Sequence, residues 1–288
     1  MQDYMQEPRR TALASRVLAL IAITLSSLLP ASPQTAGASP MPISISYSLV
    51  MPRLTLHQPV IVTFKVSNAS SQTIGLDLGQ DRKGGFSFTI TPPDGVRLKL
   101  SMPAREGASR IGRLSIAPGD SYSQNLVLNE WYDFSITGKY KVEGHLTEPI
   151  VIGNGQGYQS DPGLYASIEI GPRNELSLSK TCDSLANQIE ASDSYAQAID
   201  SAVALSYVND PIAVAYLRRA LSAHKLVEPI VIVGLERIGN AEAVQALADG
   251  LRADPSDTVR FRSALQRIQK QTDDAQIHEA INRILNPQ

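Results

Sequence analysis

A repeat near the C-terminal end of the sequence constrains its fold more than any other feature. The segment Asp210–Leu217 is echoed by Asn240–Leu247, with alanine, valine and leucine in matching places. An offset of about 30 residues is the size of one helix–turn–helix unit in proteins built from stacked units. A third copy follows, in which Ile277 is matched with Leu247. The pattern therefore predicts paired helices with one aliphatic side over residues 173–288.

The third copy departs from the first two at two positions. Arg262 stands where the preceding copy has Ile232, and Asp274 stands where it has Val244. A terminal unit needs a polar outer face because no neighbour covers it. We therefore expect the last copy to cap the stack of helices.

The N-terminal residues have the pattern of an export signal. Val17–Leu29 is an apolar run of about 13 residues, which is typical of a signal peptide and short for a bilayer span. Three basic residues precede the run: Arg9, Arg10 and Arg16. We expect a signal peptide over residues 1–38, a linker over 39–42 and a mature chain without a membrane span. The predicted location is periplasmic or secreted, and an uncleaved N-terminal membrane anchor is the alternative.

Short strands are expected between residues 43 and 172. Ile43–Leu49 and Val60–Val66 alternate apolar and polar residues, which is the pattern of a strand with one buried face. At Pro92–Gly95 the prolines preset φ and the glycine accepts a positive φ, so the chain reverses there. Two sheets that face each other bury one side of every strand. The sequence therefore predicts an antiparallel β-sandwich.

The segment Gly138–Val142 resembles the entry to a late strand of immunoglobulin-like domains. In those domains a tyrosine, here Tyr140, closes a corner by donating its hydroxyl to upstream backbone. With three further segments, it makes residues 43–172 similar to exported bacterial immunoglobulin-like domains. These segments are Pro59–Asn68, Leu76–Gly79 and Pro118–Asp120. The resemblance implies an immunoglobulin-like antiparallel β-sandwich and says little of activity.

The repeated part, residues 173–288, resembles HEAT-type repeats, most closely those of the phycobilisome lyase-like family. The repeat length, the turn positions and the small alanine residues agree. The resemblance implies a short α-helical HEAT-like solenoid after the β-sandwich, so the predicted fold class is a two-domain β + α protein. It also raises a bilin lyase-like enzyme as an alternative function, which the predicted export disfavours.

Composition excludes several classes of function. A net charge of −2 argues against nucleic-acid binding, which needs a strongly basic surface. The one cysteine, Cys182, lies on an apolar stripe, so we expect a buried thiol. No two histidines are spaced as metal ligands. They are His57, His145, His224 and His278. We therefore expect no metal, no cofactor and no catalytic constellation.

Two groups of side chains are candidate binding residues. The aromatic cluster Trp131, Tyr132 and Phe134 is either a recognition platform or a plug of core side chains at the end of the sandwich. The second group would line a groove formed by the inner helices of the repeats. Its members are Tyr216, Arg218, Arg219, Arg237 and Arg252. Both groups are therefore candidate contacts of a protein partner.

These observations favour an exported, non-enzymatic protein–protein interaction module or scaffold of the cell envelope. Its partner would be a protein of unknown identity. The main alternative is a proteinase-inhibitor-like protein in which the loop 102–113 occupies a protease cleft. The two hypotheses draw on the same surface features, and the sequence does not separate them.

Overall fold

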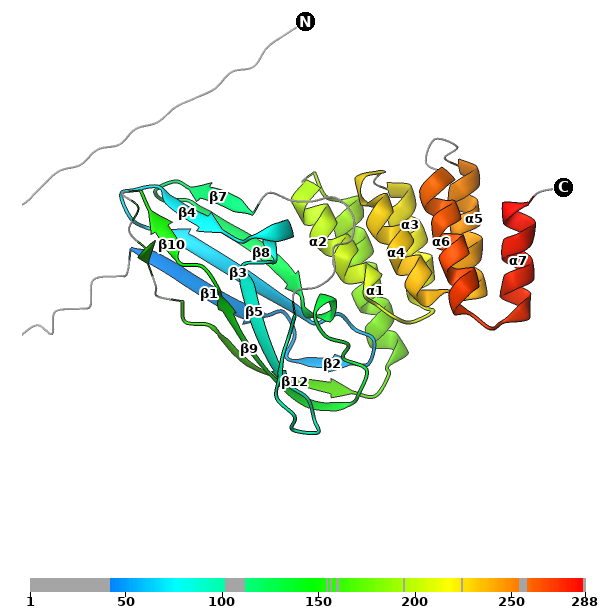
Figure 1. The fold of residues 1–288 in the computed structure, drawn as a ribbon, viewed down its shortest axis with the longest axis horizontal. Helices are drawn as coiled ribbons and strands as arrows, with labels where there is room; N and C mark the ends of the chain where they lie inside the picture. Colours follow the sequence, from blue (N-terminus) through cyan, green and yellow to red (C-terminus); the bar gives the residue numbers. More distant parts are fainter. Residues whose placement is uncertain are drawn as a thin grey trace, which may run out of the picture. The chain divides into compact units, whose positions relative to one another are not determined.

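The computed structural model describes residues 42–101, 112–153, 155, 157–158, 161–193, 195–223, 225–253 and 258–286. The predicted signal peptide, most of the linker 39–42 and most of the loop 102–113 lie outside these residues. In the described chain, strands come first and helices follow (Figure 1). Strands and helices belong to one unit that begins at Met41.

The strands form three sheets. The strands are β1 (Ile43–Leu49), β2 (Arg53–Thr55), β3 (Ile61–Asn68), β4 (Ile74–Asp77), β5 (Phe86–Thr91), β6 (Leu98–Lys99), β7 (Arg113–Ile116), β8 (Ser121–Val127), β9 (Gly138–Leu146), β10 (Ile150–Ile152), β11 (Gly157–Tyr158) and β12 (Leu164–Gly171). Three strands pair in the order β1-β3-β8, four in the order β11-β10-β4-β7 and five in the order β2-β12-β9-β5-β6. All these pairs are antiparallel except β2 with β12, which is parallel.

The predicted immunoglobulin-like antiparallel β-sandwich is wrong. The strands make three open sheets of 3, 4 and 5 strands instead of two facing sheets, and one pair is parallel. The fold is therefore three sheets followed by helices. Alternation of apolar and polar residues fixes which side of a strand is buried, but it carries no information on which strand lies beside it. The pairing of β2 with β12 joins segments that are far apart in the sequence, so no local sequence pattern predicts this pairing.

Alternation does decide which side chains enter the core. In β3, Val62, Phe64 and Val66 are fully buried, whereas Lys65 is exposed. Side chains from all three sheets meet in one hydrophobic cluster. Within it the rings of Phe64 and Phe86 pack edge to face, with centroids 5.0 Å apart. The predicted strands at residues 43–49 and 60–66 are confirmed as β1 and β3.

Tyr140 closes the corner before β9. Its hydroxyl donates to the backbone carbonyl of Ile136 over 2.7 Å, and its ring is fully buried. The rings of Tyr132 and Phe134 pack against it at centroid distances of 6.1 and 5.2 Å. The predicted bond from this hydroxyl to upstream backbone is therefore confirmed, although the sandwich in which it was expected is absent from the described residues.

The helices stack in two rows. They are α1 (Glu175–Glu190), α2 (Tyr195–Ser206), α3 (Ala213–Ala223), α4 (Glu228–Ile238), α5 (Ala241–Ala253), α6 (Thr258–Gln271) and α7 (Ala275–Leu285). In one row α1 packs against α3, α3 against α5 and α5 against α7. In the other row α2 packs against α4 and α4 against α6 (Figure 1). Helices that are neighbours in sequence connect the two rows.

The matching residues of α3 and α5 are buried alike. Ala213, Val214 and Leu217 of α3 are buried, and so are Ala243, Val244 and Leu247 at the matching places of α5. This burial agrees with the predicted aliphatic side of each helix. Membership of the HEAT family stays a prediction, because shared burial does not establish a family.

The predicted alignment of the third copy is wrong by about one helical turn. Asp274 caps α7 by accepting from the amides of Gln276 and Ile277, and Asn240 accepts from the amide of Ala243 at the start of α5. Asp274 therefore corresponds to Asn240 and not to Val244. The cause is the length of α6, which has 14 residues where α4 has 11. The added residues shift the start of α7 along the chain.

The turn between β12 and α1 ties the strands to the helices. Arg173 donates to both carboxylate oxygens of Asp210, over 2.5 and 3.0 Å. Asp210 is 2% exposed and also accepts from the amide of Ile212, just before α3. Gln58, which follows β2, donates to the Thr181 hydroxyl of α1 over 2.7 Å. These bonds hold the starts of α1 and α3 close together.

Tyr140→Phe tests the corner before β9. We expect the free energy of unfolding to fall by about 1 kcal/mol, because one hydrogen bond is lost. Urea denaturation measures the change. Tyr132→Phe is the matched control, since its hydroxyl has no hydrogen-bond partner in the described part of the chain. Equal losses in the two variants would contradict the assignment.

Asp210→Asn tests the bond between Arg173 and Asp210. Hydrogen bonds from Arg173 hold the pKa of Asp210 below its ordinary value, so its stabilising effect is present above the unfolded-state pKa of about 3.9 and is lost as pH falls through the folded-state pKa. At pH 7 we expect the variant to lose about 1–2 kcal/mol of stability.

Urea denaturation at a series of pH values checks the expected trend for Asp210→Asn. The difference from wild type should shrink steadily as pH falls below about 4. Asp120→Asn, in an exposed turn, is the control and should show a small difference at every pH. If Asp210→Asn and wild type differ in stability by the same amount at pH 7 and at pH 3, the expected effect of the carboxylate is contradicted.

Candidate functional site

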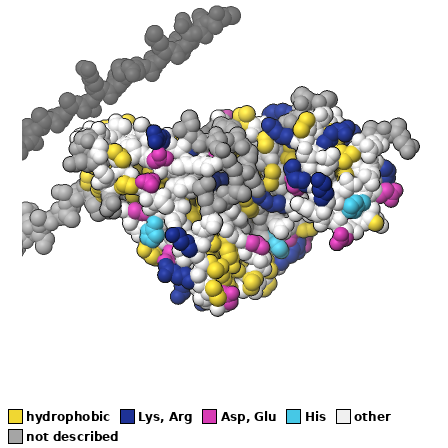
Figure 2. All heavy atoms as spheres, in the orientation of Figure 1, with side chains coloured by type: hydrophobic (Ala, Val, Ile, Leu, Met, Phe, Trp, Pro, Cys, Tyr) yellow, Lys and Arg dark blue, Asp and Glu magenta, His cyan; other side chains and the backbone are white. Residues whose placement is uncertain are grey.

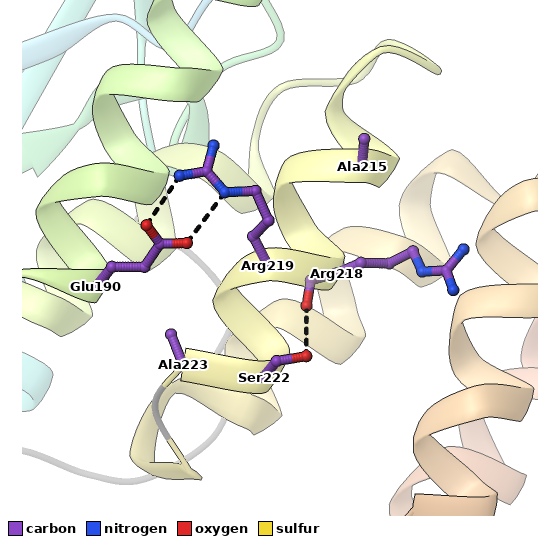
Figure 3. Close-up of a pocket in the computed structure, with 6 residues that line it drawn as sticks. All are labelled: Glu190, Ala215, Arg218, Arg219, Ser222 and Ala223. Carbon is purple, nitrogen blue, oxygen red and sulfur yellow. Dashed lines mark hydrogen bonds and ion pairs between the residues drawn. The ribbon is translucent and has the colours of Figure 1, made fainter.

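One side of α3 is turned outward and lines an open pocket. The helical period sends Ala213, Val214, Leu217 and Ala220 into the core. The opposite side of α3, together with one residue of α1, surrounds a pocket of about 690 Å³ (Figure 3). The lining residues are Glu190, Ala215, Arg218, Arg219, Ser222 and Ala223. The pocket is therefore lined by both small and charged side chains.

Arg219 spans the gap between α3 and α1. Its Nε and Nη2 donate to the two oxygens of Glu190 over 3.0 and 2.8 Å. Its Nη1 donates to Asp183 and its Nη2 to the side-chain oxygen of Asn187, each over 2.7 Å. Figure 3 shows the guanidinium directed toward Glu190. Three acceptors on one helix thus fix the orientation of this arginine.

The charges around Arg219 influence one another. The hydrogen bond from Arg219 lowers the pKa of Glu190. Glu190 and Asp183 in turn raise the pKa of Arg219. Glu190 and Arg219 are therefore both charged at neutral pH, and the guanidinium contacts the carboxylates of Glu190 and Asp183.

Arg218 points the opposite way and connects α3 to α5. Its Nη2 donates to Asp249 of α5 over 2.7 Å. Arg252 of α5 donates to the other oxygen of the same carboxylate. Ser222 donates to the backbone carbonyl of Arg218 over 3.1 Å, one turn further along α3 (Figure 3). The charged array therefore runs across α1, α3 and α5.

The structure brings together four of the five predicted groove residues. Tyr216, Arg218 and Arg219 lie on α3 and Arg252 on α5. The hydroxyl of Tyr216 is hydrogen-bonded to Ser179 of α1 at 2.6 Å, and Arg219 lies 5.8 Å from the centroid of its ring. These residues share the row of α1, α3 and α5, which is the row that carries the pocket.

Arg237 lies apart from this group. It belongs to α4, in the other row of helices, and donates to the backbone carbonyl of Ser206 over 3.3 Å. Its guanidinium lies 3.9 Å from the centroid of the Tyr207 ring. Arg237 therefore connects α4 to α2 and does not border the pocket on α3.

The predicted aromatic cluster lies at the edge of the strand core. Phe134 is 3% exposed, and Trp131 and Tyr132 are half-buried against the same cluster. The Trp131 ring contacts Phe88 edge to face at a centroid distance of 5.1 Å. The sequence left two interpretations open, a recognition platform and a plug of core side chains. These contacts favour the core side chains.

The sequence did not single out the acceptors on α1. Asp183, Asn187 and Glu190 follow one another at spacings of four and three, which places them on one side of a helix. That spacing is a signal in the sequence. It becomes informative only when Arg219 is known to lie opposite, which depends on how α1 packs against α3.

Cys182 was expected to carry a buried thiol. Its side chain is fully buried, and burial raises the pKa of the thiol to about 12. The thiol therefore stays protonated and packs as a small apolar group, as predicted. Among the described residues, no group of three or more His, Cys, Asp or Glu side chains is arranged to hold a metal ion. None of the described helices combines the length and apolar character needed to cross a bilayer.

Comparisons with known proteins find distant structural likeness. No protein-family model matches the chain. No curated protein matches its sequence. The chain is similar to a structural-genomics target, SoR45, with 14% identity over 44% of this chain and 80% of that one, and a TM-score of 0.24.

Two further structures show likeness of the same degree. A β-glucosidase from Listeria innocua in complex with glucose has 12% identity over 45% of this chain and 16% of the glucosidase, with a TM-score of 0.25. The CARDB domain of a Pyrococcus furiosus protein in complex with di-metal ions has 7% identity over 45% of this chain and 87% of that domain, with a TM-score of 0.24. The chain thus spans a small part of the glucosidase, and scores this low support no conclusion on fold or function.

Arg219→Gln tests the bridge between α3 and α1. Without the guanidinium, we expect the pKa of Glu190 to rise toward its ordinary value, because the hydrogen bond from Arg219 is the main cause of its lowering. An NMR titration of the glutamate carboxyl carbons measures this pKa. Arg283→Gln removes an exposed arginine of α7 and should leave the pKa of Glu190 unchanged. A pKa of Glu190 that is insensitive to Arg219→Gln would show that the bridge does not form in solution.

Proposed function

We propose that this chain is an exported, non-enzymatic protein-binding module, and that the side of α3 between α1 and α5 is its binding surface. We call this binding surface the α3 surface. Its residues are Glu190, Ala215, Tyr216, Arg218, Arg219, Ser222, Ala223, Asp249 and Arg252. The part of the proposal that concerns export rests on the sequence pattern of residues 1–38.

The observation that carries the proposal is the network of Arg219 and Arg218. Each arginine is fixed by carboxylates of a neighbouring helix before any partner arrives. Ordering long side chains at an interface costs about 0.5–1.5 kcal/mol each, so side chains that are already ordered favour binding. Arginine and tyrosine are also frequent among the residues that dominate the binding energy of protein interfaces. The α3 surface supplies both.

The shape of the α3 surface supports a protein partner over a small ligand. The pocket is open, and its lining combines the small Ala215 and Ala223 with charged groups. Ligand pockets usually enclose most of a small molecule with apolar walls. An open pocket with alanine in its lining admits a protruding side chain of a partner protein, while the charged lining residues contact the surroundings of that side chain.

Ala215→Trp tests the α3 surface. Ala215 is exposed and lines the pocket, so the indole fills the pocket without entering the core. Affinity capture from cell-envelope extract, followed by mass spectrometry, compares this variant with wild type. We expect wild type to capture a defined protein and Ala215→Trp to weaken its capture by at least about tenfold, as expected when a central contact of an interface is blocked.

Gln266→Trp is the control for the capture experiment. It places the same indole on an exposed position of α6, in the other row of helices. Thermal unfolding of both variants shows whether the fold is kept. The proposal fails if the two variants capture the same protein equally well, or if wild type captures no defined protein.

A further inference from the structure

The outer face of the five-stranded sheet is unusually basic. Alternation buries Tyr140 and Val142 of β9 and turns Lys139 and Lys141 outward. The same rule turns Glu169 of β12 and Thr89 of β5 outward. We call this side of the sheet the basic face. Its charged residues are Arg53, Arg97, Lys99, Lys139, Lys141, Glu143 and Glu169.

The register of the strands places these side chains in rows. Lys141 lies opposite Thr91 of β5 on one side and opposite Ser167 of β12 on the other. Lys99 of β6 lies opposite Thr89, which in turn lies opposite Glu143. Neighbouring strands are about 4.8 Å apart, so Lys141 lies close to a hydroxyl side chain on each side, whereas Lys139 lies opposite Glu169. Figure 2 shows Lys and Arg side chains gathered with a histidine over the region of β9.

The basic face carries an excess of positive charge. It has five basic residues and two acidic ones. Arg97 pairs with Glu143, and Arg53 lies 3.7 Å from Glu169. In the part of the chain that the structure describes, Lys99, Lys139 and Lys141 form no ion pair, and all three are exposed. Three ammonium groups are thus available to an anionic partner.

The remaining side chains of the basic face indicate the chemistry of that partner. The hydroxyls of Thr89, Thr91 and Ser167 can donate and accept hydrogen bonds. Tyr165 is 69% exposed, and its hydroxyl lies 3.2 Å from Nε2 of His145. An exposed ring offers an apolar plane with a polar tip. Carboxylates, hydroxyls and flat apolar ring faces are the groups that such a surface complements.

A bilayer surface fits the basic face less well. Binding at a membrane interface depends on apolar side chains that enter the headgroup region, in addition to basic residues. The exposed Leu98 of β6 lies opposite the buried Ile90, so it points away from the basic face. Tyr165 is the large exposed hydrophobic residue that the alternation of β12 places on the basic face. The strands described here therefore offer few apolar side chains to a bilayer on this face.

We propose that the basic face binds an acidic polysaccharide that carries carboxylate groups. Lys99, Lys139 and Lys141 contact the carboxylates, the threonine and serine hydroxyls bond to sugar hydroxyls, and the Tyr165 ring stacks on a sugar ring. This surface belongs to the strands and is separate from the α3 surface. Its binding therefore does not depend on the function proposed for the helices.

The test measures binding of the purified chain to polygalacturonate by isothermal titration calorimetry. Lys139→Gln/Lys141→Gln removes two charges from the basic face, and we expect at least about tenfold weaker binding, which corresponds to about 1.4 kcal/mol. Lys65→Gln/Lys180→Gln removes the same charge from exposed positions of β3 and α1 and should bind like wild type. Binding should weaken as salt is added, because the interaction is between exposed charges.

Binding to two other polymers shows whether the basic face recognises an acidic polysaccharide or any polyanion. Dextran, which is neutral, should not bind. Polyglutamate, which has carboxylates but no sugar rings, should bind several times more weakly than polygalacturonate. Tyr165→Ala should weaken binding to polygalacturonate and leave binding to polyglutamate unchanged.

Four results would overturn the proposal. They are no binding to polygalacturonate, equal effects of the two double variants, polyglutamate binding as tightly as polygalacturonate, and tighter binding to phosphatidylglycerol vesicles than to the polysaccharide. The Ala215→Trp variant should bind polygalacturonate like wild type. That measurement distinguishes a failure of this proposal from a failure of the proposed function of the α3 surface.

Discussion

The buried carboxylate of Asp210 is the interaction on which the arrangement of the described chain depends. A carboxylate that is 2% exposed is stable only when it is paired and hydrogen-bonded. Arg173 supplies the pair and the amide of Ile212 supplies a further bond. Arg173 ends the connection from the last strand, and Ile212 precedes α3. One carboxylate therefore joins the end of the strands, the start of α1 and the start of α3.

The position of α3 then determines the α3 surface. With α1 and α3 held side by side, Arg219 reaches the acceptors of α1, and Arg218 on the other side reaches α5. Glycine allows helices to approach closely, α4 to α2 within one row and α5 to α6 between the rows. A Cβ atom on Gly234 would come within 2.8 Å of the Ser206 backbone, and one on Gly250 within 2.4 Å of the Phe261 ring. Close packing at these two points and ion pairs at the outer edge therefore stabilise the same stack.

Patterns that act within one segment were predictable from the sequence, and contacts between segments were not. Alternation predicted β1 and β3, and the repeat predicted the buried residues of α3 and α5. The same alternation led to two facing sheets, because pairing such as that of β2 with β12 has no local signal. The acceptors of Arg219 were missed for a related reason: they belong to α1, which lies outside the repeated segments. Three added residues in α6 were enough to misplace the third copy.

Site-specific crosslinking shows whether the α3 surface contacts a protein partner. The photoreactive residue p-benzoylphenylalanine is placed at Ala215 or, as a comparison, at Gln266, and cells that produce the chain are illuminated. Ala215 lines the pocket, and Gln266 is exposed on the other row of helices. The account predicts a discrete crosslinked product from position 215 and none from position 266. No product from position 215, or the same product from both positions, would contradict it.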